Sequence, residues 1–143
     1  MTSYVPEAAR HRVIEAFGSR CSYYLAAQQY VLSKLEIEHI IPVALDGSND
    51  EWNLCLACRL CNLYKSDQIE ATDPISKAIV ALFNPRTQTW SDHFQWSQDG
   101  AIIVGLTPVG RATVEALRLN NEIAVEVRRN WVLVGWHPPS DVK

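Results

Sequence analysis

The stretch that decides the fold is "EHIIPVALDGSNDEWNLCLACRLCNLYK", which runs from Glu38 to Lys65. A glutamate and a histidine stand side by side at its start, and asparagines and closely spaced cysteines follow. These side chains serve proton transfer, hydrogen bonding and metal binding. Their concentration in one segment predicts a functional site, and the local patterns around them predict how the chain brings them together.

The pattern of this segment predicts two strands followed by a helix. Residues 35–41, "LEIEHII", alternate with the period of a strand, and Pro42 ends it. The turn residues of "LDGSND" separate this strand from a second short one at 53–57, "NLCLA". The next stretch, "RLCNLYKSDQIEA" at 59–71, reads as a helix that ends before Asp73-Pro74.

The flanking sequence predicts further helices and strands around this core. Pro6 and Gly18 bracket an N-terminal helix. Strands are expected in "WSDHFQW" at 90–96 and "AIIVG" at 101–105, joined by a turn at Asp99-Gly100 and extending the sheet. One closing helix begins after Thr107-Pro108, and a second contains Ile123 and Trp131. The expected class is α+β, and without repeats or linkers the expected domain is residues 1–143.

Composition sets limits on the class of protein. The chain has 143 residues, 48% of them apolar, which is enough for a hydrophobic core. It contains no apolar run of the roughly 18 residues that a membrane span needs, so a cytoplasmic protein is expected. Its net charge of −3 counts against strong nonspecific binding to nucleic acid. A binding face would therefore need local basic residues: Arg10, Arg12, Arg20, Arg59, Lys65 and Arg86 are the candidates.

The predicted elements allow polar groups from the strand and the helix to meet. Glu38 and His39 are neighbours on a strand and point to opposite faces, unless the strand ends there, as Pro42 permits. Asn62 and Lys65 are three apart and share a helix face, which packing across the strands would turn toward His39. Imidazole can accept a proton from water, and carboxylate and amide oxygens suit Mg²⁺ or Mn²⁺. This set fits metal-assisted hydrolysis of a phosphodiester.

Residues 21–65 resemble the HNH endonucleases, in which a ββα-metal core carries the catalytic groups. The resemblance rests on "EHIIP", on "NL" at Asn53-Leu54 and on "CRLCNLYK". The third motif position is Asn62, as in the H-N-N variants of that family. The resemblance implies a core at about 20–73. The remaining extension, 74–143, looks like that of small stand-alone bacterial HNH proteins.

The resemblance also implies roles for individual residues in a metal-dependent DNA endonuclease. His39 would be the general base, and Asn53 would hold its loop or imidazole in orientation. Glu38 and Asn62 would bind a single Mg²⁺ or Mn²⁺ ion, and the products would carry a 5′-phosphate. Arg59 and Lys65, on the helix, are the expected contacts to the phosphates of the DNA.

The cysteines depart from the pattern of many relatives, in which two Cys-x-x-Cys pairs hold a structural zinc ion. The second pair, Cys58 and Cys61, is present, but the first reads "CSYY", so that Tyr24 follows Cys21 in place of a cysteine. Structural zinc favours four nitrogen or sulfur ligands, and Cys21, Cys58 and Cys61 supply three. The zinc ion is therefore expected to be absent or weakly held.

Two other interpretations remain open at this point. A lone histidine on a strand is usually structural, and Asn53 and Asn62 taken singly fit a turn residue and a helix cap. The chain would then be either a noncatalytic nucleic-acid-binding or interaction module on an HNH scaffold or, as the second of these interpretations, a protein with a structural role only. The sequence favours the enzyme because Glu38, His39 and the two asparagines occur together. It does not determine the oligomeric state, the DNA sequence preference or the choice between nicking and double-strand cleavage.

Overall fold

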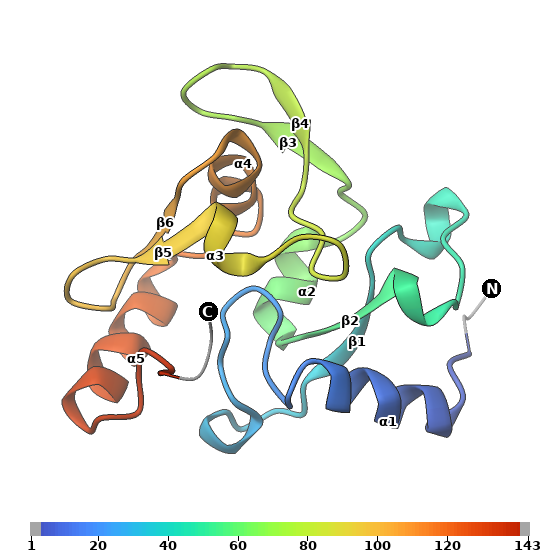
Figure 1. Cartoon of the computed structure of the whole chain (residues 1–143), viewed down its shortest axis with the longest axis horizontal. Coiled ribbons are helices and arrows are strands. Elements are labelled where there is room, and N and C mark those ends of the chain that lie inside the picture. The colour runs from blue at the N-terminus through green and yellow to red at the C-terminus, as the bar shows by residue number, and fades with distance from the viewer. Residues whose placement is uncertain (1–3, 141–143) are drawn as a thin grey trace. The chain divides into compact units, whose positions relative to one another are not determined.

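A computed structural model describes residues 4–140 and divides the chain into two compact units (Figure 1). The first unit runs to Ile69 and includes Asn84–Thr87, and the second contains Glu70–Phe83 and the chain from Gln88 onward. Helices and short antiparallel strand pairs occur together, which confirms the expected α+β class. That the whole chain acts as one domain stays a prediction.

The first unit contains the two strands and the helix expected from the opening stretch. Helix α1 spans Glu7–Ala16, strand β1 Glu36–His39, strand β2 Leu54–Ala57 and helix α2 Arg59–Lys65. Single 3-10 turns lie at Gln28–Tyr30, Val43–Leu45 and Glu51–Asn53. Strands β1 and β2 pair antiparallel with Glu38 opposite Cys55 and His39 opposite Leu54. This confirms the order of strand, loop, strand and helix.

The core of the first unit lies between α1 and the strand pair. Val13 of α1 and Leu54 and Leu56 of β2 are almost fully buried in one apolar cluster, with Ile37 of β1 packed against it. Burial of these side chains fixes the strand pair on one face, since each contributes about 1.5–3 kcal/mol when removed from water. The opposite edge of β1 stays open for the polar residues of the site.

Helix α2 is shorter than the sequence pattern predicted. It ends at Lys65 and not at residue 71, because Ser66 adopts a positive φ of 48° that leaves the helical conformation. The last residues of the expected helix form strand β3, Glu70–Thr72, which pairs with β4, Ile79–Ala81. A serine gives no sequence signal for such a stop, whereas a glycine would have done so.

The second unit contains β3, β4 and the remaining elements. Helix α3 spans Trp90–His93, β5 Phe94–Trp96, β6 Ile103–Gly105, α4 Pro108–Ala116 and α5 Glu122–Leu133. Strands β5 and β6 form the expected hairpin, but they are shorter than predicted: residues 90–93 of the first expected strand form helix α3, and the second strand begins only at Ile103. The Thr107 side chain caps α4 at Gly110 N, as predicted. The strands do not extend one sheet. Within the described residues, the strands form three separate two-stranded sheets.

Two arginines, the partly buried Arg111 and the buried Arg128, hold the second unit together. Arg111 forms a bidentate ion pair with Asp73, at 2.8 and 2.9 Å, and this pairing holds the pKa of the Asp73 carboxyl far below its usual value. Arg128 donates to the carbonyl of Ala101 at 2.9 Å. Among residues 4–140, no helix is both long and apolar enough to cross a membrane.

Candidate active site at the end of strand β1

Strand β1 presents its polar residues beside helix α2, which contacts it directly. Glu36 and Glu38 point to the face that meets α2, and the alternation of a strand places His39 on the other side. The strand ends at His39, so a hollow of about 340 Å³ at this end is lined by Glu38, His39 and Asn62 together. Three of the residues expected in the site therefore border one open space.

His39 is partly exposed and is held by a neighbour that the sequence did not single out. Its Nε2 lies 2.8 Å from Asn49 Oδ1, while Asn49 Nδ2 donates to the carbonyl of Tyr4 at 2.8 Å. Because the Asn49 oxygen accepts, this arrangement favours a proton on Nε2 and a lone pair on Nδ1. The ring is thus oriented with Nδ1 as the nitrogen that can take a proton.

Asn53 fastens the loop that follows His39. Its Oδ1 accepts from Ile41 N at 2.8 Å, and its Nδ2 donates to the carbonyls of Ile41 at 3.0 Å and Ser48 at 2.8 Å. The loop is also tight at Gly47, where a Cβ would lie 1.6 Å from the Ile41 carbonyl oxygen. No other residue fits there. The asparagine side chain and this glycine together fix the backbone next to His39.

Glu38 and Lys65 form a buried pair beneath the hollow. The Lys65 Nζ lies 3.2 Å from Glu38 Oε1 and donates to the carbonyls of His39 at 3.2 Å and Ile40 at 3.0 Å. The side chains are 2% exposed for Lys65 and 6% for Glu38. Burial raises the pKa of the Glu38 carboxyl to about 7, against the lowering effect of Lys65. Lys65, expected on the surface as a phosphate contact, thus lies inside the fold and clamps the end of β1.

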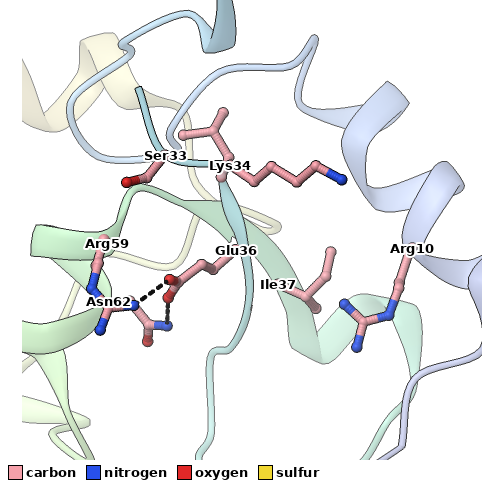
Figure 2. A pocket seen from close by; sticks show the side chains of 8 residues that line it. Arg10, Ser33, Lys34, Glu36, Ile37, Arg59 and Asn62 are labelled. Carbon is pink, nitrogen blue, oxygen red and sulfur yellow. Dashed lines mark hydrogen bonds and ion pairs between the residues drawn. The ribbon is translucent and has the colours of Figure 1, made fainter. Parts of the chain in front are cut away.

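Asn62 contacts Glu36, a carboxylate that was not among the residues expected in the site. Its Nδ2 donates to Glu36 Oε1 at 2.6 Å, and Arg59 Nη1 lies 3.3 Å from Glu36 Oε2 (Figure 2). Asn62 and Glu38 both line the hollow, but in the part of the chain that the structure describes Asn62 donates to Glu36, whereas Glu38 accepts from Lys65. The signal for Glu36 was present in the sequence, because residues two apart on a strand share a face.

The cysteines expected near the helix start do meet. The sulfurs of Cys21, Cys58 and Cys61 all lie within 4.8 Å of one another, a group that can hold a metal ion. Although burial raises it, hydrogen bonds from Cys58 and Cys61 hold the pKa of Cys21 below its usual value. Tyr24 adjoins the group through its backbone, since Tyr24 N lies 3.4 Å from Cys21 Sγ. Cys55 lies apart on β2, where burial raises its pKa to about 12.

Comparison with known proteins supports the interpretation of this segment. Residues 20–68 match the model of a family described as HNH endonuclease. No curated protein and no solved structure matched the chain. The matched range begins just before Cys21 and contains the strand pair, helix α2 and the hollow at His39. The segment from residue 20 to residue 68 therefore belongs to the HNH endonuclease family, whose members are nucleases.

Proposed function

We propose that this chain is a metal-dependent DNA endonuclease with His39 as its general base. The observation that carries the proposal is the single hollow at the end of β1, which Glu38, His39 and Asn62 line together. A base and two oxygen ligands around one open space fit hydrolysis of a phosphodiester by an activated water molecule. The family of residues 20–68 supports a nuclease of this kind.

In this proposal His39 Nδ1 removes the proton from the attacking water. The hydrogen bond to Asn49 keeps the ring in one orientation, and the Asn53 contacts to Ile41 keep the backbone next to the ring in place. A base held in this way loses little entropy when it meets the water, which is why positioned base catalysis contributes about 10²–10⁴-fold. Asn49 and Asn53 are positioning residues here, since neither is assigned a contact to the substrate.

The donor set at the hollow fits a hard divalent cation, Mg²⁺ or Mn²⁺. Carboxylate and amide oxygens suit such ions, and Asn62 uses its nitrogen for Glu36, which leaves its oxygen to serve as a ligand. Lys65 holds the buried Glu38 carboxylate in place beside the hollow. When bound, the cation would stabilise the negative charge that develops on the phosphate and on the leaving oxygen.

Glu38 and Asn62 are expected to act as a unit in cation binding. Glu38→Gln, which keeps an acceptor for Lys65, and Asn62→Ala should each raise the Mn²⁺ concentration for half-maximal DNA cleavage by about tenfold or more. The double variant should need little more Mn²⁺ than the more strongly affected single variant, because the effects of removing two ligands of one ion are not additive. Calorimetric titration with Mn²⁺ in the absence of DNA should show the same order of affinities.

Asp46→Asn is the matched control for this comparison, since Asp46 is an exposed carboxylate on the loop after β1. It should leave the requirement for Mn²⁺ unchanged. If both single variants needed no more Mn²⁺ than the parent, the cation would have to bind elsewhere, and this part of the proposal would fail.

We further propose that the three-cysteine group holds zinc weakly or not at all. Zinc–sulfur bonds of about 2.3 Å place tetrahedral ligands about 3.8 Å apart, which three sulfurs within 4.8 Å of one another can approach. The fourth ligand is lacking at Tyr24. Protein purified without chelators is expected to contain well under one zinc per chain, and Tyr24→Cys about one, by metal analysis.

Tyr24→Ser is the control for the zinc measurement, because it removes the phenol without adding a thiolate. It should remain as poor in zinc as the parent. About one tightly held zinc per chain in the parent itself would show that another group completes the site, and the proposal of a weakened site would be wrong.

A further inference from the structure

A second hollow adjoins the one at His39 and runs along the outer side of β1. Its volume is about 700 Å³, and it is lined by Arg10, Lys34, Glu36, Arg59 and Asn62 together with Ser33, Leu35 and Ile37 (Figure 2). We call it the β1 groove. It shares Ile37 and Asn62 with the hollow at His39, so the two spaces meet along the strand. All of these residues belong to the first unit.

The β1 groove concentrates positive charge in a chain whose net charge is negative. Its cations come from three separate segments: Arg10 from α1, Lys34 from the loop before β1 and Arg59 from the start of α2. All three side chains are exposed. Glu36 is the acidic residue of the lining, against these three cations. A groove with this balance attracts an anionic ligand even though the formal charge of the chain is −3.

Hydrogen bonds position two of these cations. Arg10 donates from Nε to the carbonyl of Val5 at 3.1 Å, which anchors the guanidinium of a side chain that lines the groove. Glu36 accepts both from Arg59, at 3.3 Å, and from Asn62, at 2.6 Å. Arg59 is nevertheless 76% exposed, so an exposed ion pair of this length yields readily to a phosphate. Glu36 thereby links the basic groove to the proposed cation ligand.

We propose that the β1 groove binds the phosphodiester backbone of the DNA strand on one side of the scissile phosphate, with Arg10, Lys34 and Arg59 as the phosphate contacts. This inference rests on the proposed function, in which the hollow at His39 holds the scissile phosphate. From His39 to Glu36 strand β1 covers three residue steps of about 3.3 Å, and this length of about 10 Å matches about three nucleotide steps along a duplex. Lys34 lies beyond the end of the strand and lengthens the groove further. The β1 groove would thus be the local basic surface that a nucleic-acid-binding chain of net negative charge needs, and that composition alone could not locate.

The first test measures how DNA binding depends on salt. A fluorescein-labelled duplex is titrated with protein in EDTA, which prevents cleavage, and anisotropy gives the affinity between 50 and 200 mM salt. Arg10→Ala, Lys34→Ala and Arg59→Ala should each weaken binding about three- to tenfold. Each should also reduce the slope of log K against log salt concentration by about one. Thermal unfolding verifies that the variants, all at exposed positions, remain folded.

Arg129→Ala is the matched control, since Arg129 is an exposed arginine on α5, outside the first unit. It should leave both affinity and salt slope within error of the parent. If the three groove variants behaved like this control while the parent bound and cleaved DNA, the β1 groove proposal would be overturned and the proposed function would stand. A parent that neither bound nor cleaved DNA would overturn both.

The second test asks whether the contacts lie on one side only. Neutral methylphosphonates replace single phosphates on either side of the cleaved bond in the parent's substrate. Substitutions should weaken binding on one side, over several nucleotides, and this effect should disappear in the Arg10→Ala, Lys34→Ala double variant, because the contact is then already lost. Equal effects on both sides, or effects that persist in the double variant, would contradict the assignment of the β1 groove.

Discussion

His39→Ala is expected to lower the rate of metal-dependent DNA cleavage by about 10²–10⁴-fold. In the proposed function the imidazole serves proton transfer and not core packing, since it is partly exposed at the end of β1 and hydrogen-bonds to the loop residue Asn49. The fold and the affinity for DNA should therefore remain close to those of the parent. Rates of plasmid cleavage, anisotropy with labelled DNA and thermal unfolding measure the three quantities on the same preparation.

His11→Ala provides the control for general effects of removing a histidine. His11 lies on α1 with its side chain 73% exposed and contacts Glu7 within the same helix. This variant should cleave DNA at the parent's rate. Cleavage by His39→Ala within about threefold of the parent would remove His39 from the role of base.

Lys65→Met is expected to lower the free energy of unfolding by about 3–5 kcal/mol. The substitution keeps most of the apolar stem but removes an ammonium group that contacts Glu38 and the carbonyls of His39 and Ile40 in a buried position. These oxygens would lose their partner where water does not replace it. Urea unfolding in EDTA measures the difference, and Lys34→Met, at an exposed lysine, should change stability by less than about 0.5 kcal/mol.

The loss of folding stability caused by Lys65→Met should grow as the pH rises. Burial holds the pKa of Glu38 at about 7 in the folded parent, above its unfolded value, so folding favours the protonated carboxyl and this contribution declines as pH rises from about 4.3 to 7. Lys65 lowers the pKa of Glu38, so its removal raises that pKa further and extends the decline above pH 7. The variant should therefore be closer to the parent at pH 5 than at pH 8.

A second substitution separates the buried charge from the packing around it. In the Glu38→Leu, Lys65→Met double variant no carboxylate remains buried without a partner, so much of the lost stability should return. If the free energy of unfolding of Lys65→Met at pH 8 were within about 1 kcal/mol of the parent's, the Glu38–Lys65 pair would not be the clamp inferred for the end of β1.

The local elements of the site could be predicted from the sequence because their signals are local. Alternation around Glu38 and the stop at Pro42 indicate the first strand, and the spacing of Cys58, Cys61 and Asn62 indicates the helix. The three cysteines were also expected to form one group, and their sulfurs do lie close together. The N-terminal helix, the β5–β6 hairpin and the cap at Thr107 follow from similar short-range patterns.

The partners of the site residues could not be predicted, because they depend on packing between distant segments. The spacing of Asn62 and Lys65 placed both on one helix face, but it gave neither the depth of Lys65 nor the preference of Asn62 for Glu36. Asn49 lies in a loop that carries turn residues, so nothing distinguished it as the partner of His39. The end of α2 at Ser66 depends on a positive φ that serine does not signal.

The basic residues that form a binding face could likewise not be identified from the sequence alone. Of the candidates, Arg10 and Arg59 line the β1 groove, whereas Lys65 is buried. Arg86 belongs to the segment Asn84–Thr87, where its Nε donates to the Leu54 carbonyl at 2.8 Å and its guanidinium lies 5.0 Å from the Phe17 ring. Composition counts charges, but only the arrangement of the elements determines which of them face a ligand.

Cleavage of supercoiled plasmid by the purified chain tests the central claim most directly. The parent is incubated with Mg²⁺, with Mn²⁺ or with EDTA, beside His39→Ala purified in the same way to control for contaminating nucleases. The expected result is nicked or linear DNA with 5′-phosphate ends in either metal, no cleavage in EDTA, recovery when metal is added in excess of EDTA, and little cleavage by the variant. Plasmid that stays supercoiled with the parent in both metals, or that is cut equally well in EDTA, would contradict it.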